Sequence, residues 1–128
     1  MNEMSVPRPA LVFKICSAEE WRAALASGAY AGSADDARDG FIHLSCAHQL
    51  AGTLARHFAA RADLVLLAVR TADLGPALRF EPSRGGDRFP HLYTALSAAS
   101  VAWQVPLALG SDGRHGLPAD LADLAPHP

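Results

Sequence analysis

The sequence predicts a single α+β domain in which helices pack on a mostly antiparallel sheet. Roughly five or six short segments have the patterning of strands, whereas only two segments have clear helical periodicity, and both lie toward the amino end. Strands and helices do not alternate as they would in a βαβ repeat, which argues against a doubly wound parallel sheet. A chain of 128 residues has a usual length for one domain with its own core.

The first strand is expected at residues 11–16, an apolar segment interrupted by Lys14. Because side chains alternate across a strand, Lys14 shares a face with Val12 and Cys16. Leu11, Phe13 and Ile15 take the other face. A lysine in such a strand requires a partner or a function.

A capping box predicts the helix that follows this strand. Ser17 and Glu20 stand at the N-cap and N3 positions, and Gly28 supplies the C-terminal stop. The apolar stripe that we expect to be buried consists of Trp21, Ala24 and Leu25. Residues 29–38 are small and polar, which predicts a surface connection.

A turn at Asp39-Gly40 is expected to start a second strand at residues 41–44. Alternation places Phe41 and His43 on one face of this strand and Ile42 and Leu44 on the other. Ser45 is expected to cap a second helix. The apolar stripe of that helix consists of Ala47, Leu50, Ala51, Leu54 and Phe58.

The remaining strands follow in the second half of the chain. Residues 63–69 form a continuous apolar run, which is typical of a central strand buried on both faces. Residues 78–81 alternate, with Arg79 and Glu81 pointing away from Leu78 and Phe80. The turn-rich loop 82–88 is of the kind that often carries binding residues. A segment at 89–93 precedes a last strand at 101–107, with Val101, Trp103 and Val105 on one face.

The ends of the chain carry weaker patterns. Beyond Gly110 the sequence predicts turns and one weak helical turn at residues 119–124. We expect the domain to span residues 11–117, with flexible segments at 1–10 and 118–128.

Composition excludes several classes of protein. The formal net charge of −2 offers no broad basic surface for nucleic acid. Two cysteines are too few for a disulfide scaffold, and no apolar run has the length of a signal peptide or a membrane span. The sequence therefore predicts a cytoplasmic protein without a membrane partner.

Common metal and nucleophile motifs are missing. The six histidines include no HExxH or HxH spacing, and there is no cysteine pair, so no metal site is expected. No GxSxG element marks a nucleophilic serine.

The candidate site consists of polar residues that interrupt apolar strands. If these strands present the same face, their side chains would converge on a cleft suited to an anionic ligand and to acid–base chemistry. The residues are Lys14, His43, Glu81, His91 and Tyr93.

Each candidate has a structural alternative. His43 could be a satisfied core histidine, and Tyr93 could be a half-buried amphipathic tyrosine. Glu81 could form a cross-strand ion pair with Arg79, Arg84 or Arg88.

These motifs resemble the DUF952 family of uncharacterised bacterial proteins, from about Leu11 to Leu117. The resemblance is carried by several segments in the same order: 13–15, Trp21, 39–45, 57–58, 80–82 and 89–93.

A more distant resemblance concerns chemistry. The order of strand, capped helix, Ile42-His43-Leu44-Ser45, helix and apolar strand is similar to that of the NAD-dependent RNA 2'-phosphotransferases. Those proteins have the ADP-ribosyltransferase fold, so this resemblance implies a split, mostly antiparallel sheet with a cleft for NAD. By position, His43 and Ser45 would lie on the NAD-facing strand.

The same resemblance implies roles for the other candidates. Lys14 would contact a phosphate group, His91 and Tyr93 would line the nicotinamide side, and Glu81 would lie near the ribose. The implied catalytic residues are His43, His91 and Glu81, and either His91 or Glu81 could fill the place of the superfamily's third motif. The implied cofactor-binding residues are Lys14, His43, Ser45 and Tyr93.

We therefore expect an ADP-ribosyltransferase-like domain that binds NAD or a related nucleotide and either transfers ADP-ribose or processes a phosphorylated acceptor, as an ADP-ribosyl or phosphoryl transferase whose acceptor is left open. Lys14 stands where that superfamily usually has histidine or arginine, which favours the alternative of a catalytically inactive nucleotide- or metabolite-binding module. A protein-interaction module on the same fold is a further alternative, because a fold does not fix a function.

Overall fold

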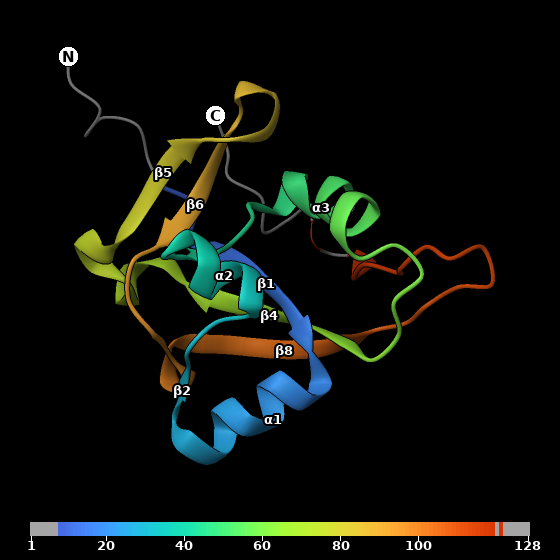
Figure 1. Cartoon of the computed structure of the whole chain (residues 1–128), viewed down its shortest axis with the longest axis horizontal. Coiled ribbons are helices and arrows are strands. Elements are labelled where there is room, and N and C mark those ends of the chain that lie inside the picture. Colours follow the sequence, from blue (N-terminus) through green and yellow to red (C-terminus); the bar gives the residue numbers. More distant parts are fainter. Residues whose placement is uncertain (1–7, 120, 122–128) are drawn as a thin grey trace.

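The computed structural model describes residues 8–119 and 121, and within them an α+β fold with three small antiparallel sheets and three α-helices (Figure 1). The prediction of two helices was therefore one too few. The strands are β1 (Leu11–Ser17), β2 (Ala29–Tyr30), β3 (Ile42–His43), β4 (Leu64–Arg70), β5 (Leu78–Pro82), β6 (Arg88–Leu92), β7 (Leu96–Ser97) and β8 (Val101–Leu107). The helices are α1 (Ala18–Ser27), α2 (Ala34–Asp39) and α3 (Leu50–His57).

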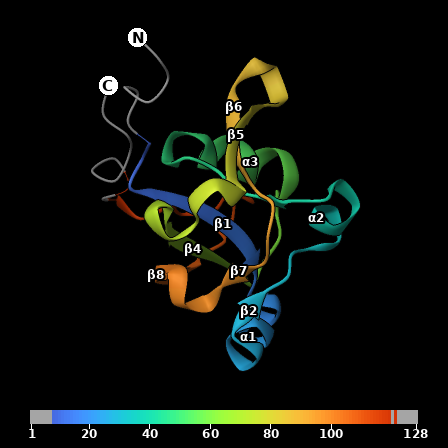
Figure 2. The same ribbon diagram turned by 90° about the vertical axis from the view of Figure 1, so that its left-hand side faces the viewer.

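The first sheet has the strand order β1-β4-β8, which confirms the central position predicted for β4. All residues of β4 except Arg70 are buried. The β1 and β4 side chains that point to one face join α1, and those that point to the other face join α3. The sheet consequently lies between these two helices (Figure 2).

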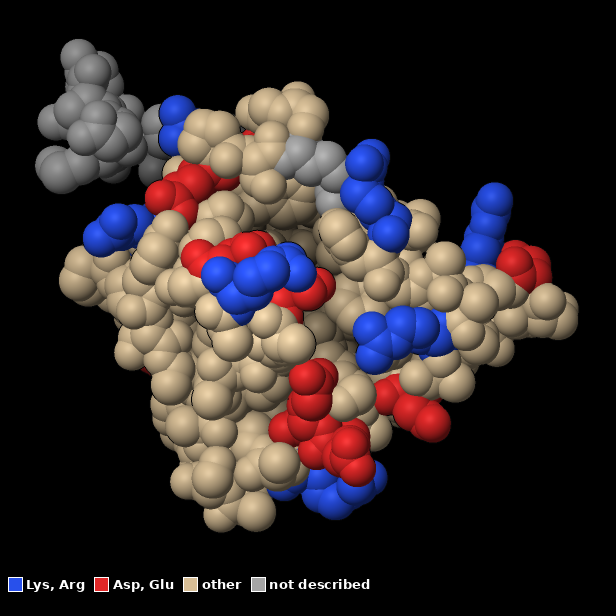
Figure 3. Space-filling view, viewed as in Figure 1, with Lys and Arg blue, Asp and Glu red and all other residues tan. Residues whose placement is uncertain are grey.

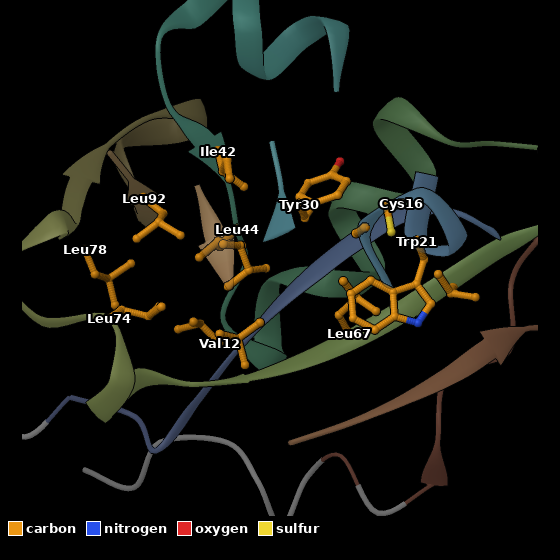
Figure 4. Packing of buried hydrophobic residues seen from close by; sticks show 14 residues of the cluster. Val12, Cys16, Trp21, Tyr30, Ile42, Leu44, Leu67, Leu74, Leu78 and Leu92 are labelled. Carbon is orange, nitrogen blue, oxygen red and sulfur yellow. The ribbon is translucent and has the colours of Figure 1, made fainter. Parts of the chain in front are cut away.

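The larger core cluster also takes in the second three-stranded sheet, whose order is β3-β6-β5. In the close view, Trp21 and Cys16 lie toward one end of this cluster and Leu74, Leu78 and Leu92 toward the other (Figure 4). The β5–β6 hairpin projects from the body of the molecule at the end opposite α1 (Figure 2).

Helix α1 confirms its predicted capping. The Ser17 hydroxyl accepts the Glu20 N–H at 3.0 Å, the Glu20 carboxylate accepts the Ser17 N–H at 2.9 Å, and Gly28 ends the helix at φ 92°. Trp21 and Ala24 are buried as predicted, but Leu25 is 58% exposed. Leu25 lies about 100° further round the helix than Ala24, beyond the line that faces the core.

Residues 29–38 are not the plain surface connection that their composition predicts, because they contain β2 and most of α2. Ser33 and Asp36 form a second capping box, and Gly40 ends α2 at φ 85°. The Asp36 side chain is buried, so this polar segment places a charge inside the molecule.

The strand predicted at 41–44 has the expected alternation, with Ile42 and Leu44 buried. Ser45 does not cap the next helix. Its backbone N–H and carbonyl both pair with Phe13 at 2.8 Å, and these bonds keep Ser45 in the strand arrangement. The following turn, Ala47–Gln49, has Cys46 at its N-cap, where the Gln49 side chain accepts the Cys46 N–H.

The last strand departs from its predicted pattern at a register shift. Ala68 pairs with Trp103 whereas Val69 pairs with Val101, which leaves Ala102 as the extra residue of a bulge. Val101 consequently packs against the larger cluster, while Trp103 and Val105 pack against the other one.

Most of the helical turn predicted at 119–124 and much of the two predicted flexible ends lie outside the described residues. Among the described helices, none is long and apolar enough to cross a membrane.

Candidate functional site

A cleft of about 460 Å³ opens beside α2 and α3, where β1 meets β3 and β6. Figure 3 shows this hollowed face, with acidic and basic side chains gathered around it. Four of the predicted site residues line the cleft, namely Lys14, His43, Ser45 and His91.

Strand pairing brings these four residues together. His43 of β3 lies opposite His91 of β6, and the bridge between Phe13 and Ser45 places Lys14 beside them. The imidazole ring centres of His43 and His91 are 5.9 Å apart. The Phe41 ring stacks on that of His91 at 4.0 Å and lies 4.6 Å from that of His43.

Asp36 is the buried centre of the polar network, with only 3% of its surface exposed. Its Oδ1 accepts the Nδ1 and backbone N–H groups of His43, at 2.6 and 3.0 Å. Its Oδ2 accepts hydrogen bonds from Lys14 Nζ and the Ser33 N–H, both at 2.9 Å. Burial alone would raise the pKa of this carboxyl, but the His43 hydrogen bond and the Lys14 charge outweigh it and hold the pKa well below 3.8.

Lys14 is a paired lysine. Besides the bond to Asp36, its ammonium donates to the His43 carbonyl at 3.1 Å and lies 5.7 Å from the centre of the Tyr30 ring. An ammonium group has three N–H donors, so one remains beyond these two hydrogen bonds. The predicted contact between Lys14 and a phosphate therefore depends on this remaining donor.

His43 lies between two carboxylates. Its Nδ1 faces Asp36, and its Nε2 lies 2.9 Å from Oδ2 of Asp39. A neutral imidazole has a single N–H, and an ionised carboxylate only accepts, so both contacts are hydrogen bonds when the ring carries two protons.

His91 has a carboxylate partner of its own. Glu81 Oε1 accepts from His91 Nδ1 at 2.8 Å and from the Tyr93 hydroxyl at 2.7 Å. The hydrogen bond from Tyr93, and after it the bond from His91, lower the pKa of the Glu81 carboxyl. The same Tyr93 bond to Glu81 raises the pKa of Tyr93. With Nδ1 as the donor, His91 keeps Nε2 as its accepting nitrogen.

The described side chains do not support the ion-pair alternative for Glu81 with Arg79 or Arg88. Its carboxylate instead accepts hydrogen bonds from His91 and Tyr93. The Arg79 guanidinium lies 4.7 Å over the Tyr93 ring, and Arg88 donates to the Phe80 carbonyl.

Glu81 and Tyr93 are not part of the cleft lining. Glu81 binds Nδ1 of His91 but does not itself line the cleft. Tyr93 lines a separate, more open hollow of about 220 Å³ together with Phe41. The structure thus brings the Glu81, His91 and Tyr93 side chains together as a group, but only His91 of the three reaches the cleft.

Sequence reasoning missed several further residues of the cleft. Asp36 carried a usable signal, since Ser33 and Asp36 have capping-box spacing. The sequence pattern of Asp39 predicts only a turn. Arg38 and Arg56 also line the cleft, but neither belongs to a sequence motif that would have indicated a binding role.

The described residues contain no group of three or more His, Cys, Asp or Glu side chains suited to a metal ion. Both cysteines are buried and free, and burial raises the pKa of Cys46 to about 11 and that of Cys16 to about 12. Neither thiol is therefore an activated nucleophile at neutral pH. The chemistry of the cleft rests on histidine, carboxylate and basic side chains.

Comparisons with known proteins match nearly the whole domain. The family model described as "Protein of unknown function (DUF952)" matches residues 15–104. An X-ray structure of protein CC0527 from Caulobacter crescentus is 49% identical, with a TM-score of 0.84, over 88% of this chain and 98% of that chain. The solution NMR structure of CC0527 is 47% identical, with a TM-score of 0.75, over 91% and 97% of the two chains. A comparison with curated proteins gives no match.

Proposed function

The chain belongs to the DUF952 family, and we propose that it binds a small phosphorylated nucleotide, NAD or ADP-ribose, in the cleft between its two three-stranded sheets. One observation carries the proposal: histidine and arginine side chains, together with three aspartates of α2, line a cleft of about 460 Å³. That volume falls within the range of roughly 300–1,000 Å³ that is usual for small-molecule sites.

The arrangement of the sheets supports the hypothesis of an ADP-ribosyltransferase-like domain. Among the described residues, the bridge between Phe13 and Ser45 joins β1 to the segment that follows β3, and residues of β1, β3 and β6 line the cleft. A split sheet with a nucleotide between its halves is what the resemblance to the RNA 2'-phosphotransferases implies.

The walls of the cleft fit such a ligand. Arg38 and Arg56 offer guanidinium donors for phosphate oxygens, and both are exposed to solvent. The hydroxyls of Ser45 and Thr53, which lie 3.2 Å apart, can bond to a ribose.

His91 is the residue that we assign to proton transfer. Bound NAD would supply an ADP-ribose unit that is transferred to the acceptor as nicotinamide leaves. His91 Nε2 would accept the proton of the attacking acceptor group, while Glu81 stabilises the resulting imidazolium through Nδ1. Glu81 is thus a positioning residue in this proposal, rather than one that touches the ribose.

A specific observation favours the alternative of a binding module without turnover. Asp36 neutralises Lys14 and also binds His43, so two predicted ligand-binding groups already have protein partners. The same satisfied network is what a protein-interaction domain with structural histidines would have.

Isothermal titration with NAD and ADP-ribose tests the binding proposal. We expect binding by the native chain and its loss in His43→Ala, with His48→Ala as the matched control because His48 is exposed and outside the cleft lining. Circular dichroism verifies that both variants fold. Absence of heat with either nucleotide would refute the binding proposal.

Nicotinamide release from NAD then separates the enzyme from the binding module. We expect native activity, and its loss in His91→Asn with nucleotide affinity retained. Binding without any release would favour the module.

A further inference from the structure

We infer that Arg38 and His43 form an anion subsite at the α2 edge of the cleft, which the carboxylate of Asp39 occupies in the free chain. This inference rests on the proposed nucleotide binding, because it names the part of the cleft that takes a phosphate group.

The first evidence is the position of Asp39 between the Arg38 guanidinium and the His43 ring, whose Nε2 is a donor when the ring carries two protons. Asp39 Oδ1 accepts from Arg38 Nε at 3.2 Å, and its Oδ2 lies 2.9 Å from His43 Nε2. All three side chains line the cleft. A guanidinium and an imidazolium that converge on one carboxylate form the donor pattern by which proteins bind phosphate and carboxylate groups.

The donor from His43 is fixed in place. Asp36 holds both the Nδ1 and the backbone N–H of this residue, and Asp36 is itself held by Lys14 and Ser33 inside the molecule. The His43 ring therefore cannot turn Nε2 away without breaking a buried network.

Asp39, by contrast, can be replaced as the acceptor. It is the last residue of α2, directly before Gly40, and its side chain is 36% exposed. Turning this carboxylate into water leaves no buried group without a partner. A ligand phosphate can then take both donors, and the negative charge of Asp39 opposes its entry.

Two consequences follow for ligand choice. The subsite admits anions strong enough to displace a carboxylate, which favours a phosphate over a neutral sugar. Asp39 lowers the affinity of the native chain for such a ligand, so its removal should strengthen binding.

Asp35 provides the matched control. It lies on the same helix, lines the same cleft and accepts a hydrogen bond from Arg38 at 3.0 Å, but among the described residues it does not pair with His43. Asp35→Ala therefore removes the same charge from the same helix without releasing His43 Nε2.

The test is a titration of the native chain, Asp39→Ala and Asp35→Ala with ADP-ribose and, separately, with inorganic pyrophosphate. We expect Asp39→Ala to bind ADP-ribose about tenfold more tightly than the native chain, and Asp35→Ala to change affinity by less than about threefold. Equal gains in both variants would show a general charge effect and would overturn the subsite.

The outcomes separate this inference from the proposed function. If the native chain binds ADP-ribose and Asp39→Ala binds it no better, the subsite is wrong and the nucleotide proposal stands. If pyrophosphate binds to Asp39→Ala while no variant binds ADP-ribose, the subsite stands and the nucleotide proposal fails. Failure of every chain to bind either probe overturns both.

Discussion

Asp36 and His43 are joined twice, through the ring Nδ1 at 2.6 Å and through the backbone N–H at 3.0 Å, both to the same carboxylate oxygen. This double attachment fixes β3 against α2 and sets the direction in which the His43 ring faces the cleft. The other oxygen of Asp36 holds Lys14, so one buried carboxylate links β1, α2 and β3.

We predict that Asp36→Asn costs about 3–5 kcal/mol of unfolding free energy, because it leaves the buried Lys14 ammonium without a counter-charge. Lys14→Met should cost less, about 1–3 kcal/mol, since Asp36 keeps the hydrogen bonds from His43 and Ser33. The double variant should cost less than the sum of the two single changes. Urea unfolding measures all three, with Asp35→Asn as an exposed control. Additive costs would mean that the Lys14–Asp36 pair is not coupled.

The same carboxylate predicts a dependence on pH. Asp36 has a lower pKa in the folded chain than the ordinary value of 3.8. Its contribution to stability is therefore complete above about pH 4 and is lost as the pH falls below that value, where the unfolded chain takes up the proton first. Urea midpoints measured from pH 6 to pH 2.5 should fall more steeply for the native chain than for Asp36→Asn. If the urea midpoints of the two chains fall in parallel with pH, Asp36 does not contribute to this pH dependence. A carbon-13 NMR titration of the Asp36 carboxyl measures its pKa directly.

A third prediction concerns Tyr93 and Glu81. The Tyr93 hydroxyl makes the largest contribution to lowering the Glu81 pKa, ahead of His91. Tyr93→Phe should therefore raise the Glu81 pKa toward its ordinary value, while the Glu81–His91 contact at 2.8 Å keeps the Nδ1–H form of His91. Glu81→Leu should abolish the preference for that form. The NMR chemical shifts of the His91 ring nitrogens distinguish the two variants. Unchanged nitrogen shifts in Glu81→Leu would show that Glu81 does not position the His91 ring.

Local patterns predicted much of the fold. The capping box of Ser17 and Glu20 specifies a helix start within a few residues, and the apolar run of β4 reports burial on both faces. The alternation of Phe41 and His43 against Ile42 and Leu44 likewise depends on neighbours in the sequence. Each of these signals is complete within one element.

The errors arose where contacts join distant residues. Ser45 has the residue type of a helix cap, but its backbone pairs with Phe13, which lies thirty-two positions earlier in the sequence. That pairing decides the conformation of Ser45. Sequence reasoning also missed the partner of Lys14, because Asp36 lies in a segment whose composition predicts a surface. No periodicity reports a contact of this kind.

The last prediction concerns Trp21, whose ring is buried while its indole Nε1 has no hydrogen-bond partner among the described residues. Trp21→Ala should cost about 3–5 kcal/mol, because it removes a large buried ring from the cluster beneath α1. Trp21→Phe should remain within about 1 kcal/mol of the native chain, since removing the unpartnered N–H offsets part of the lost packing. Leu25→Ala, on the exposed side of the same helix, should change stability by less than about 0.5 kcal/mol. Urea unfolding at pH 7 compares the free energies of unfolding of the three variants.

Equal losses of stability in Trp21→Phe and Trp21→Ala would mean that the indole N–H is satisfied, for instance by a buried water. The bond of that N–H, rather than the ring volume, would then stabilise α1.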